Sequence, residues 1–95
     1  MNEELLTAAK SIQLRNMLNI LEVLRIHNSN SKSATIRKAM IGVNPGMTAI
    51  ENLVEYGLID LKDMGRVHWI SINNRGREAL KHWRSFDRFF FGEIK

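Results

Sequence analysis

The sequence predicts a mainly α-helical domain with a small β-hairpin, and three observations support this fold class. Apolar residues recur at three- and four-residue steps over most of the chain, which is the spacing of one helix face. Residues 58–72 are instead rich in branched and aromatic residues and interrupted by a short turn, as a hairpin is. At 95 residues, 44% of them hydrophobic, the chain can form one small core. We therefore expect a single domain over residues 1–95.

The first predicted helix covers roughly residues 3–27. Apolar residues at helical spacing mark its second half: Leu14, Met17, Leu18, Leu21 and Leu24. The same pattern continues toward the beginning of the chain at Leu5, Leu6, Ala9 and Ile12. A helix this long exceeds what one small core requires, so its first part has apolar surface to spare. That surplus predicts a partner chain.

A polar cluster, Asn28–Lys32, is predicted to be a loop that leads into a short second helix. Ser33 is the expected N-cap, because its hydroxyl can accept from the free N–H groups of the first turn, and the helix is expected to end near Met40. Arg37 and Lys38 are expected to point outward. The residues expected on the inward side are Ala34, Ile36, Ala39 and Met40.

The third helix is predicted over Pro45–Tyr56, with Asn44 as its cap and Gly57 as the left-handed residue that ends it. Its expected buried residues are Ala49, Ile50 and Leu53, with Val54 at the margin. The periodicity leaves five residues outside: Met47, Thr48, Glu51, Asn52 and Glu55.

Two strands, residues 58–62 and 66–72, are predicted on either side of an Asp63-Met64-Gly65 turn. Ile70 and Ile72 are expected to face the core. Trp69 is expected on the outer side, where it would stack on a sugar or base or pack against the last helix or a partner. Asn73 is the expected N-cap of a last helix, whose apolar positions are Ala79, Leu80, Trp83, Phe86 and Phe90.

The positive charge is concentrated in two parts of the chain. The formal net charge is +4 and the pI is near 9.9. Residues 25–48 carry four basic residues and no acid, and residues 61–84 carry six basic residues against two acids. Residues 49–60 carry three acids and no basic residue. If folding joins the two basic segments they form a phosphate-binding face; otherwise they are scattered solvated charges.

No pattern predicts an enzyme, a cofactor or a metal site. The sequence has no cysteine, which excludes disulfides and thiolate ligands. His68 and His82 lie far apart without a paired carboxylate motif, so we expect no metal. No nucleophile–base spacing and no glycine-rich phosphate loop occurs, so no catalytic residue is expected. No apolar run approaches the ~18 residues that span a bilayer, and Glu3 and Glu4 do not fit a secretion signal, so we expect a soluble cytoplasmic protein.

From about Leu14 to Trp83 the chain resembles the winged helix-turn-helix transcription regulators of prokaryotes, especially small dimeric archaeal and archaeal-virus members and the MarR and PadR groups. Three segments carry the resemblance: the junction LVEYGLI at residues 53–59, the hairpin, and INNRGREAL at residues 72–80. The resemblance implies a winged helix-turn-helix with extended N- and C-terminal helices. It also implies that the third helix enters the major groove of DNA and that the hairpin tip reaches phosphates or the minor groove.

Carried over by position, the residues implied to contact duplex DNA are Lys32, Arg37, Lys38, Asn44, Met47, Thr48, Asn52 and Arg66. Asn52 suits adenine and Met47 a thymine methyl group. The third helix departs from the family, because it exposes Glu51 and Glu55 where arginine or lysine is common. Acids near phosphates oppose binding, although Glu51 could accept from a cytosine amino group.

The resemblance and the spare apolar surface together predict a homodimer. The expected core is about residues 14–83, with the terminal helices 3–13 and 84–91 as dimerisation extensions; the alternative for the latter is a disordered aromatic tail. The expected interface residues are Leu5, Leu6, Ala9, Ile12, Trp83, Phe86 and Phe90. The expected function is a DNA-binding transcriptional regulator of archaeal or viral type. The alternatives are a winged helix that binds protein without sequence-specific DNA binding, and an antitoxin or viral accessory factor.

Overall fold

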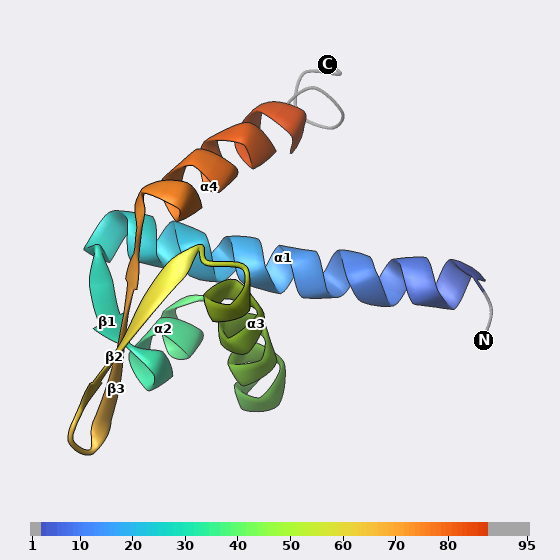
Figure 1. The fold of residues 1–95 in the computed structure, drawn as a ribbon. Coiled ribbons are helices and arrows are strands. Elements are labelled where there is room, and N and C mark those ends of the chain that lie inside the picture. Colours follow the sequence, from blue (N-terminus) through green and yellow to red (C-terminus); the bar gives the residue numbers. More distant parts are fainter. Residues whose placement is uncertain (1–2, 88–95) are drawn as a thin grey trace.

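The computed structural model describes the backbone of residues 3–87 and the side-chain surroundings of residues 12–83. The elements follow one another as α1 (Glu3–His27), β1 (Ser29–Ser31), α2 (Lys32–Lys38), α3 (Val43–Glu55), β2 (Ile59–Met64), β3 (Val67–Ile72) and α4 (Asn74–Asp87) (Figure 1). The predicted fold class, mainly α-helical with a small hairpin, is confirmed. None of the described helices is long and apolar enough to cross a membrane.

The sheet has three antiparallel strands in the order β1-β3-β2, so β3 lies in the centre. Strand β1 occupies most of Asn28–Lys32, which the sequence predicted as a loop, and its Ser31 lies opposite Trp69. The loop prediction was wrong because three polar residues have no strand pattern of their own. Their extended conformation comes from pairing with β3, which only the tertiary fold provides.

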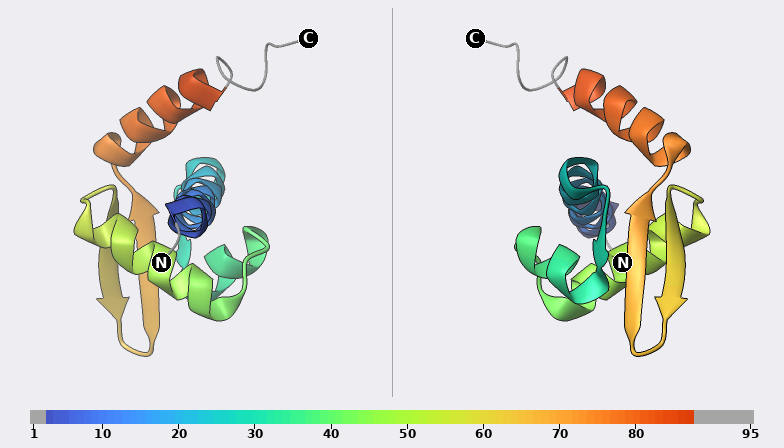
Figure 2. Two further views of the ribbon diagram at one scale, coloured as in Figure 1. Left: turned by 90° about the vertical axis from the view of Figure 1, so that its right-hand side faces the viewer. Right: turned by 90° about the vertical axis from the view of Figure 1, so that its left-hand side faces the viewer.

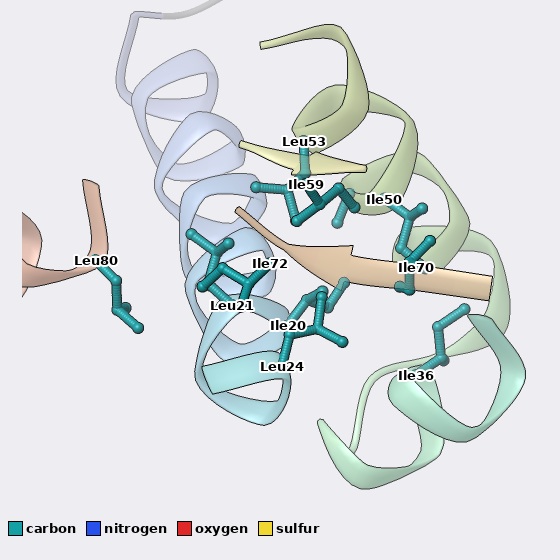
Figure 3. Close-up of a cluster of buried hydrophobic side chains, with 11 residues drawn as sticks. Ile20, Leu21, Leu24, Ile36, Ile50, Leu53, Ile59, Ile70, Ile72 and Leu80 are labelled. Atoms are coloured by element: carbon teal, nitrogen blue, oxygen red, sulfur yellow. The ribbon is translucent and has the colours of Figure 1, made fainter. Parts of the chain in front are cut away.

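The core lies between α1, α3 and one face of the sheet, as Figure 3 shows. Helix α1 contributes Ile20, Leu21 and Leu24, and the expected inward positions Ile70 and Ile72 of β3 are confirmed as buried. Each such side chain stabilises the fold by about 1.5–3 kcal/mol when fully buried. The buried apolar residues are Ile20, Leu21, Leu24, Ile36, Ala49, Ile50, Leu53, Ile59, Ile70, Ile72 and Leu80.

The N-cap of helix α2 is Ser31, two residues before the predicted cap. The Oγ of Ser31, not that of Ser33, accepts from the Ala34 N–H at 3.2 Å, and the Ser31 carbonyl accepts from the Thr35 hydroxyl at 2.7 Å. Ser31 rather than Ser33 is the N-cap because β1 holds Ser31 in the extended conformation that an N-cap needs. Met40 was expected inside, but it is 92% exposed and has a φ of 58°, in the turn between α2 and α3.

Helix α3 begins at Val43, with Gly42 rather than Asn44 in the capping position, and no side chain caps it. Its predicted buried residues Ala49, Ile50 and Leu53 are confirmed, as is the left-handed Gly57, with a φ of 74°. Met47 was expected outside, yet it is half-buried and packs against the core. The earlier start adds a half turn to α3 at the end where Asn44 lies.

The hairpin turn is Gly65-Arg66, one residue later than the sequence indicated. Gly65 has a φ of 71°, and Arg66 does not share the positive φ, which is the pattern of a type II′ turn with glycine in its first central position. Met64 consequently belongs to β2 and pairs with Val67 across the hairpin.

Two residues at the start of α4 join it to the rest of the fold. Asn73 is confirmed as the N-cap: its Oδ1 accepts from the Gly76 N–H at 2.8 Å, while its Nδ2 donates to the Gly57 carbonyl at 2.9 Å. Gly76 is buried, and a Cβ built there would lie 2.1 Å from the carbonyl oxygen of Leu58. The close approach of α4 to the segment before β2 therefore requires glycine.

We predict that Gly76→Ala lowers the free energy of unfolding by at least 1–3 kcal/mol, roughly the cost of overpacking, because backbone must move to admit the methyl group. Chemical denaturation measures this change. Gly42→Ser is the matched control: a Cβ at residue 42 meets nothing closer than 3.5 Å, and serine suits a helix cap, so stability should hold or rise slightly. Equal stability of the two variants would contradict the close approach.

Candidate nucleic-acid interface

Two of the three cations of α2 lie together at the carboxyl end of this short helix. Arg37 and Lys38 occupy its last turn and are exposed, whereas Lys32 is its first residue and is half-buried. The helix contains no acidic residue. Of the three basic residues that the sequence placed near DNA in this region, two are therefore free to meet a phosphate from the same turn.

The exposed face of α3 divides into two halves of different charge. Asn44 and Thr48, in the amino-terminal half, are exposed and neutral, and the first turn carries no acid. Glu51 and Glu55 follow on the same face toward the carboxyl end. The beginning of α3 also presents backbone N–H groups and the positive end of the helix dipole. The acids therefore lie away from the end of the helix that can best approach an anion.

Asn52 does not share that face fully. It is half-buried on the side of α3 that faces α1, where it borders an open groove of about 320 Å³. Ile12, a predicted dimer residue, lines the same groove and is 62% exposed. The groove is lined by Ile12, Gln13, Asn16, Asn44, Pro45, Thr48, Ala49 and Asn52. The structure thus brings one predicted dimer residue beside three predicted DNA contacts.

The hairpin places Arg66 at its tip but carries no net charge of its own. Asp60 and Asp63 balance Lys62 and Arg66 over residues 59–72 when His68 is neutral. The carboxylate of Asp63 lies 2.5 Å from Nδ1 of His68, its direct cross-strand partner. Arg66 is exposed and is the basic residue of the turn itself.

The second basic segment of the sequence does not form one surface. In Figures 1 and 2, α2, α3 and the hairpin tip lie on one side of α1, and α4 lies on the other. Arg75, Arg77 and Lys81 are exposed residues of α4 and so lie away from the hairpin tip. Arg77 also has a structural role, since its Nη2 donates to Oδ1 of Asn28 at 2.7 Å. Only Lys62 and Arg66 of this segment lie on the hairpin.

The beginning of α3, the last turn of α2 and the hairpin tip thus form one side of the molecule. We call this side the α2–α3–hairpin face, defined by Arg37, Lys38, Asn44, Thr48 and Arg66. It combines the cations of α2 and of the wing tip with neutral hydrogen-bonding side chains at the start of α3. Such an arrangement can hold a polyanion through the cations and present polar groups to base edges.

No protein-family model and no curated protein sequence matches this chain. Solved structures do match it. A MarR-family transcriptional regulator from Silicibacter pomeroyi gives a TM-score of 0.68 at 21% identity, over 85% of this chain and 59% of the other. F93 from STIV, described as a winged-helix DNA-binding protein, gives 0.70 at 15% identity, over 77% of this chain and 87% of the other. Sso10a-2, a DNA-binding protein from Sulfolobus solfataricus, gives 0.67 at 19% identity, over 77% and 78% of the two chains.

The fold is a winged helix. In its terms, α2 and α3 are the helix-turn-helix and the β2–β3 hairpin is the wing. The chain spans less than two thirds of the MarR-family chain, and these identities establish likeness of fold alone. The resemblance seen in the sequence is confirmed at that level, since MarR-family and archaeal-virus winged-helix structures are among those that match.

Sequence reasoning missed two contacts that shape this face. The Asp63–His68 pair depends on the strand register. A turn at Asp63-Met64-Gly65 would set Lys62 opposite Arg66, whereas in the structure Lys62 pairs with Trp69 and Asp63 with His68. The preference of a two-residue hairpin for glycine in its first turn position could have identified it. The bond from Arg77 to Asn28 joins residues far apart in the chain, and no local pattern predicts it.

Proposed function

We propose that this chain is a double-stranded DNA-binding protein that acts as a homodimer and regulates transcription. The observation that carries the proposal is the α2–α3–hairpin face, which presents the neutral start of an exposed helix on the same side of the molecule as the cations of α2 and the wing tip. Winged-helix proteins dock the second helix of the helix-turn-helix in the major groove. The similar structures, two DNA-binding proteins and a transcriptional regulator, support the same assignment.

In this proposal the amino-terminal half of α3 enters the major groove. Asn44 and Thr48 are exposed there and can exchange hydrogen bonds with base edges. Asn52 contributes from the flank beside α1, and Met47 supports the helix from the core side rather than contacting a thymine methyl group. Glu51 lies further along the helix, where a cytosine amino group is the partner that its chemistry suits.

The cations of α2 and of the wing tip contact the phosphates. Arg37 and Lys38 reach one strand from the end of α2, Lys32 lies behind them at its start, and Arg66 reaches the backbone or the minor groove from the wing tip. Because these contacts are electrostatic, affinity should fall steeply with salt.

The dimer is proposed to form through the ends of the chain, residues 3–13 and 84–91. Helix α1 has 25 residues, about 37 Å at 1.5 Å per residue, and from residue 12 onward, where its side chains are described, the buried ones lie in its last third. Its amino-terminal end projects beyond the helix-turn-helix (Figure 1), and Ile12, 62% exposed, lines the groove where the described part of α1 meets the start of α3. Trp83 is half-buried; the side chains of Leu5, Leu6, Ala9 and Phe86, and all of Phe90, lie outside the described residues. A second copy would cover this apolar surface.

Glu51 and Glu55 favour a second function, a winged helix that binds a basic protein surface. Both carboxylates are exposed on one face of α3 and no basic residue lies on that helix. Titration of a fluorescent duplex of random sequence by anisotropy, from low to physiological salt, separates the two functions. Binding at low salt that weakens with salt supports DNA binding, whereas no binding at low salt contradicts it.

We predict that Arg37→Ala with Lys38→Ala weakens binding to all duplexes alike. Each lost phosphate contact should reduce the slope of log K against log salt by about 0.9, so a dimer of the double variant, which lacks two contacts in each copy, loses about 3.6. The matched control is Arg75→Ala with Lys81→Ala, which removes the same charge from α4 on the other side of α1. An equal loss of slope in both variants would show a diffuse charge effect and contradict the proposed face.

Asn44→Ala with Thr48→Ala is predicted to change which sequences are preferred while leaving the salt slope unchanged. Each lost base contact should cost about 1–3 kcal/mol of discrimination. Selection of bound fragments from a random duplex pool, repeated with the variant, measures the change. An unaltered consensus would mean that the start of α3 does not read bases.

We predict that truncation after Trp83 converts the dimer to a monomer, because it removes the aromatic end of the proposed interface. Light scattering should give a mass of twice 11.0 kDa for the full chain and close to the monomer value for the truncated chain. Circular dichroism checks that the truncated chain stays helical. An unchanged dimer mass would exclude residues 84–95 from the interface.

A further inference from the structure

The wing ends in a pair of apolar side chains that lie directly opposite each other. Met64 closes β2 and Val67 opens β3, and the two pair in register across the Gly65-Arg66 turn. Met64 is 56% exposed and Val67 is 43% exposed, so neither side chain contributes to the core. This pair is the last feature of the hairpin before the turn.

The two faces of the wing differ in character near the tip. Cross-strand neighbours share a face, so Met64 and Val67 lie on the same face as the next pair, Lys62 and Trp69, of which Trp69 is half-buried. The other face of the tip carries the polar Asp63–His68 pair. We call the Met64, Val67 and Trp69 side the apolar wing face.

The tip extends well beyond the core. In β2 only Ile59 is buried and every later residue is exposed, and Figure 1 shows the hairpin reaching past α2. Six residues span about 20 Å in a strand, so the Met64–Val67 pair stands clear of the packed region. An exposed apolar pair at a projecting tip is free to enter a groove of a partner.

Charge alone does not explain how such a wing would contact DNA, since the hairpin is neutral overall. One cation, Arg66, lies directly between the two apolar residues in sequence. Proteins that bind the minor groove use the same combination of an arginine and apolar side chains. The arginine is attracted to the narrow groove, and the apolar group enters between base steps. The tip, with Arg66 beside two apolar side chains, therefore suits the minor groove of duplex DNA.

Building on the proposed DNA binding, we propose that the wing tip is a wedge that enters the minor groove, with Met64 and Val67 pressed against a base step and Arg66 in the groove beside them. The wedge partly unstacks that step and bends the duplex. The favoured sites are flexible pyrimidine–purine steps, because they cost least to unstack. The wing thus selects sequence by deformability, while the start of α3 reads base edges.

The test measures binding and bending on the same duplex, of about 30 base pairs with donor and acceptor dyes at its ends. Wild-type protein should raise energy transfer on binding, in keeping with a kink of about 20–90°. Met64→Gln with Val67→Thr should bind with a dissociation constant changed less than about tenfold, because lost contacts are offset by bending energy no longer spent. Its saturated complex should show the transfer of the free duplex.

Two single variants serve as controls. Leu61→Thr removes an apolar side chain, 42% exposed, from the opposite face of the wing and should leave the bend unchanged. Arg66→Ala should weaken binding, yet keep most of the bend at saturation. Thermal unfolding checks that all variants remain folded.

The outcomes separate this inference from the function on which it rests. Wild-type binding without a rise in transfer, or a full bend with the Met64/Val67 variant, overturns the wedge and leaves DNA binding intact. Loss of the bend in the Leu61→Thr variant as well would assign bending to the hairpin as a whole and also overturns the wedge. Absence of any binding at low salt removes both proposals.

Discussion

The structure depends on the burial of one stripe of α1. Ile20, Leu21 and Leu24 lie within little more than one turn of that helix, and α1 packs against α2, α3, α4, β1 and β3. A domain of this size has one core, so the placement of these five elements follows from how they contact α1, and β2 is placed by its pairing with β3. The amino-terminal end of α1 extends beyond the elements that pack on this stripe (Figure 1). One helix therefore organises the winged helix with one half and extends beyond it with the other.

Features specified by local sequence were predictable. Helical periodicity gave α1 and the buried side of α3, and a glycine with positive φ gave the end of α3 at Gly57. Asn73 was recognisable as a cap because asparagine is a preferred N-cap residue and an apolar periodic segment follows it. The features that sequence reasoning missed depend on pairing between distant segments. Ser31 replaces Ser33 as a cap only because β1 joins the sheet, and Met64 belongs to a strand only in the register that β3 sets.

The positions of the charged residues in the candidate interface were likewise only partly predictable from the sequence. Arg37 and Lys38 could be placed outward from periodicity, and the structure exposes both. The sequence could not show where the cations of the second basic segment lie in space. They are divided between the wing and α4, which lie on opposite sides of α1. Of the polar residues assigned to α3, Asn44 and Thr48 are exposed, whereas Asn52 turns toward the groove at α1. Packing in the folded chain decides which side of a helix contacts a neighbouring element. The periodicity of a single sequence predicts that side only in part.

Asn73 has a consequence for how such proteins can be rebuilt. Its side chain bonds to the end of the α3 segment at Gly57, to Asp60 of β2 at 3.2 Å and to the first turn of α4, so one short residue fixes the angle at which the last helix leaves the sheet. The joint needs this asparagine and the glycine three positions later, while Arg77 and Leu80 further along α4 bind it to Asn28 and to the core. A different terminal helix that keeps these contacts, grafted behind the same joint, would leave at the same angle and could pair with a different partner. The joint is thus a natural splice point for engineering new pairings onto an unchanged helix-turn-helix and wing.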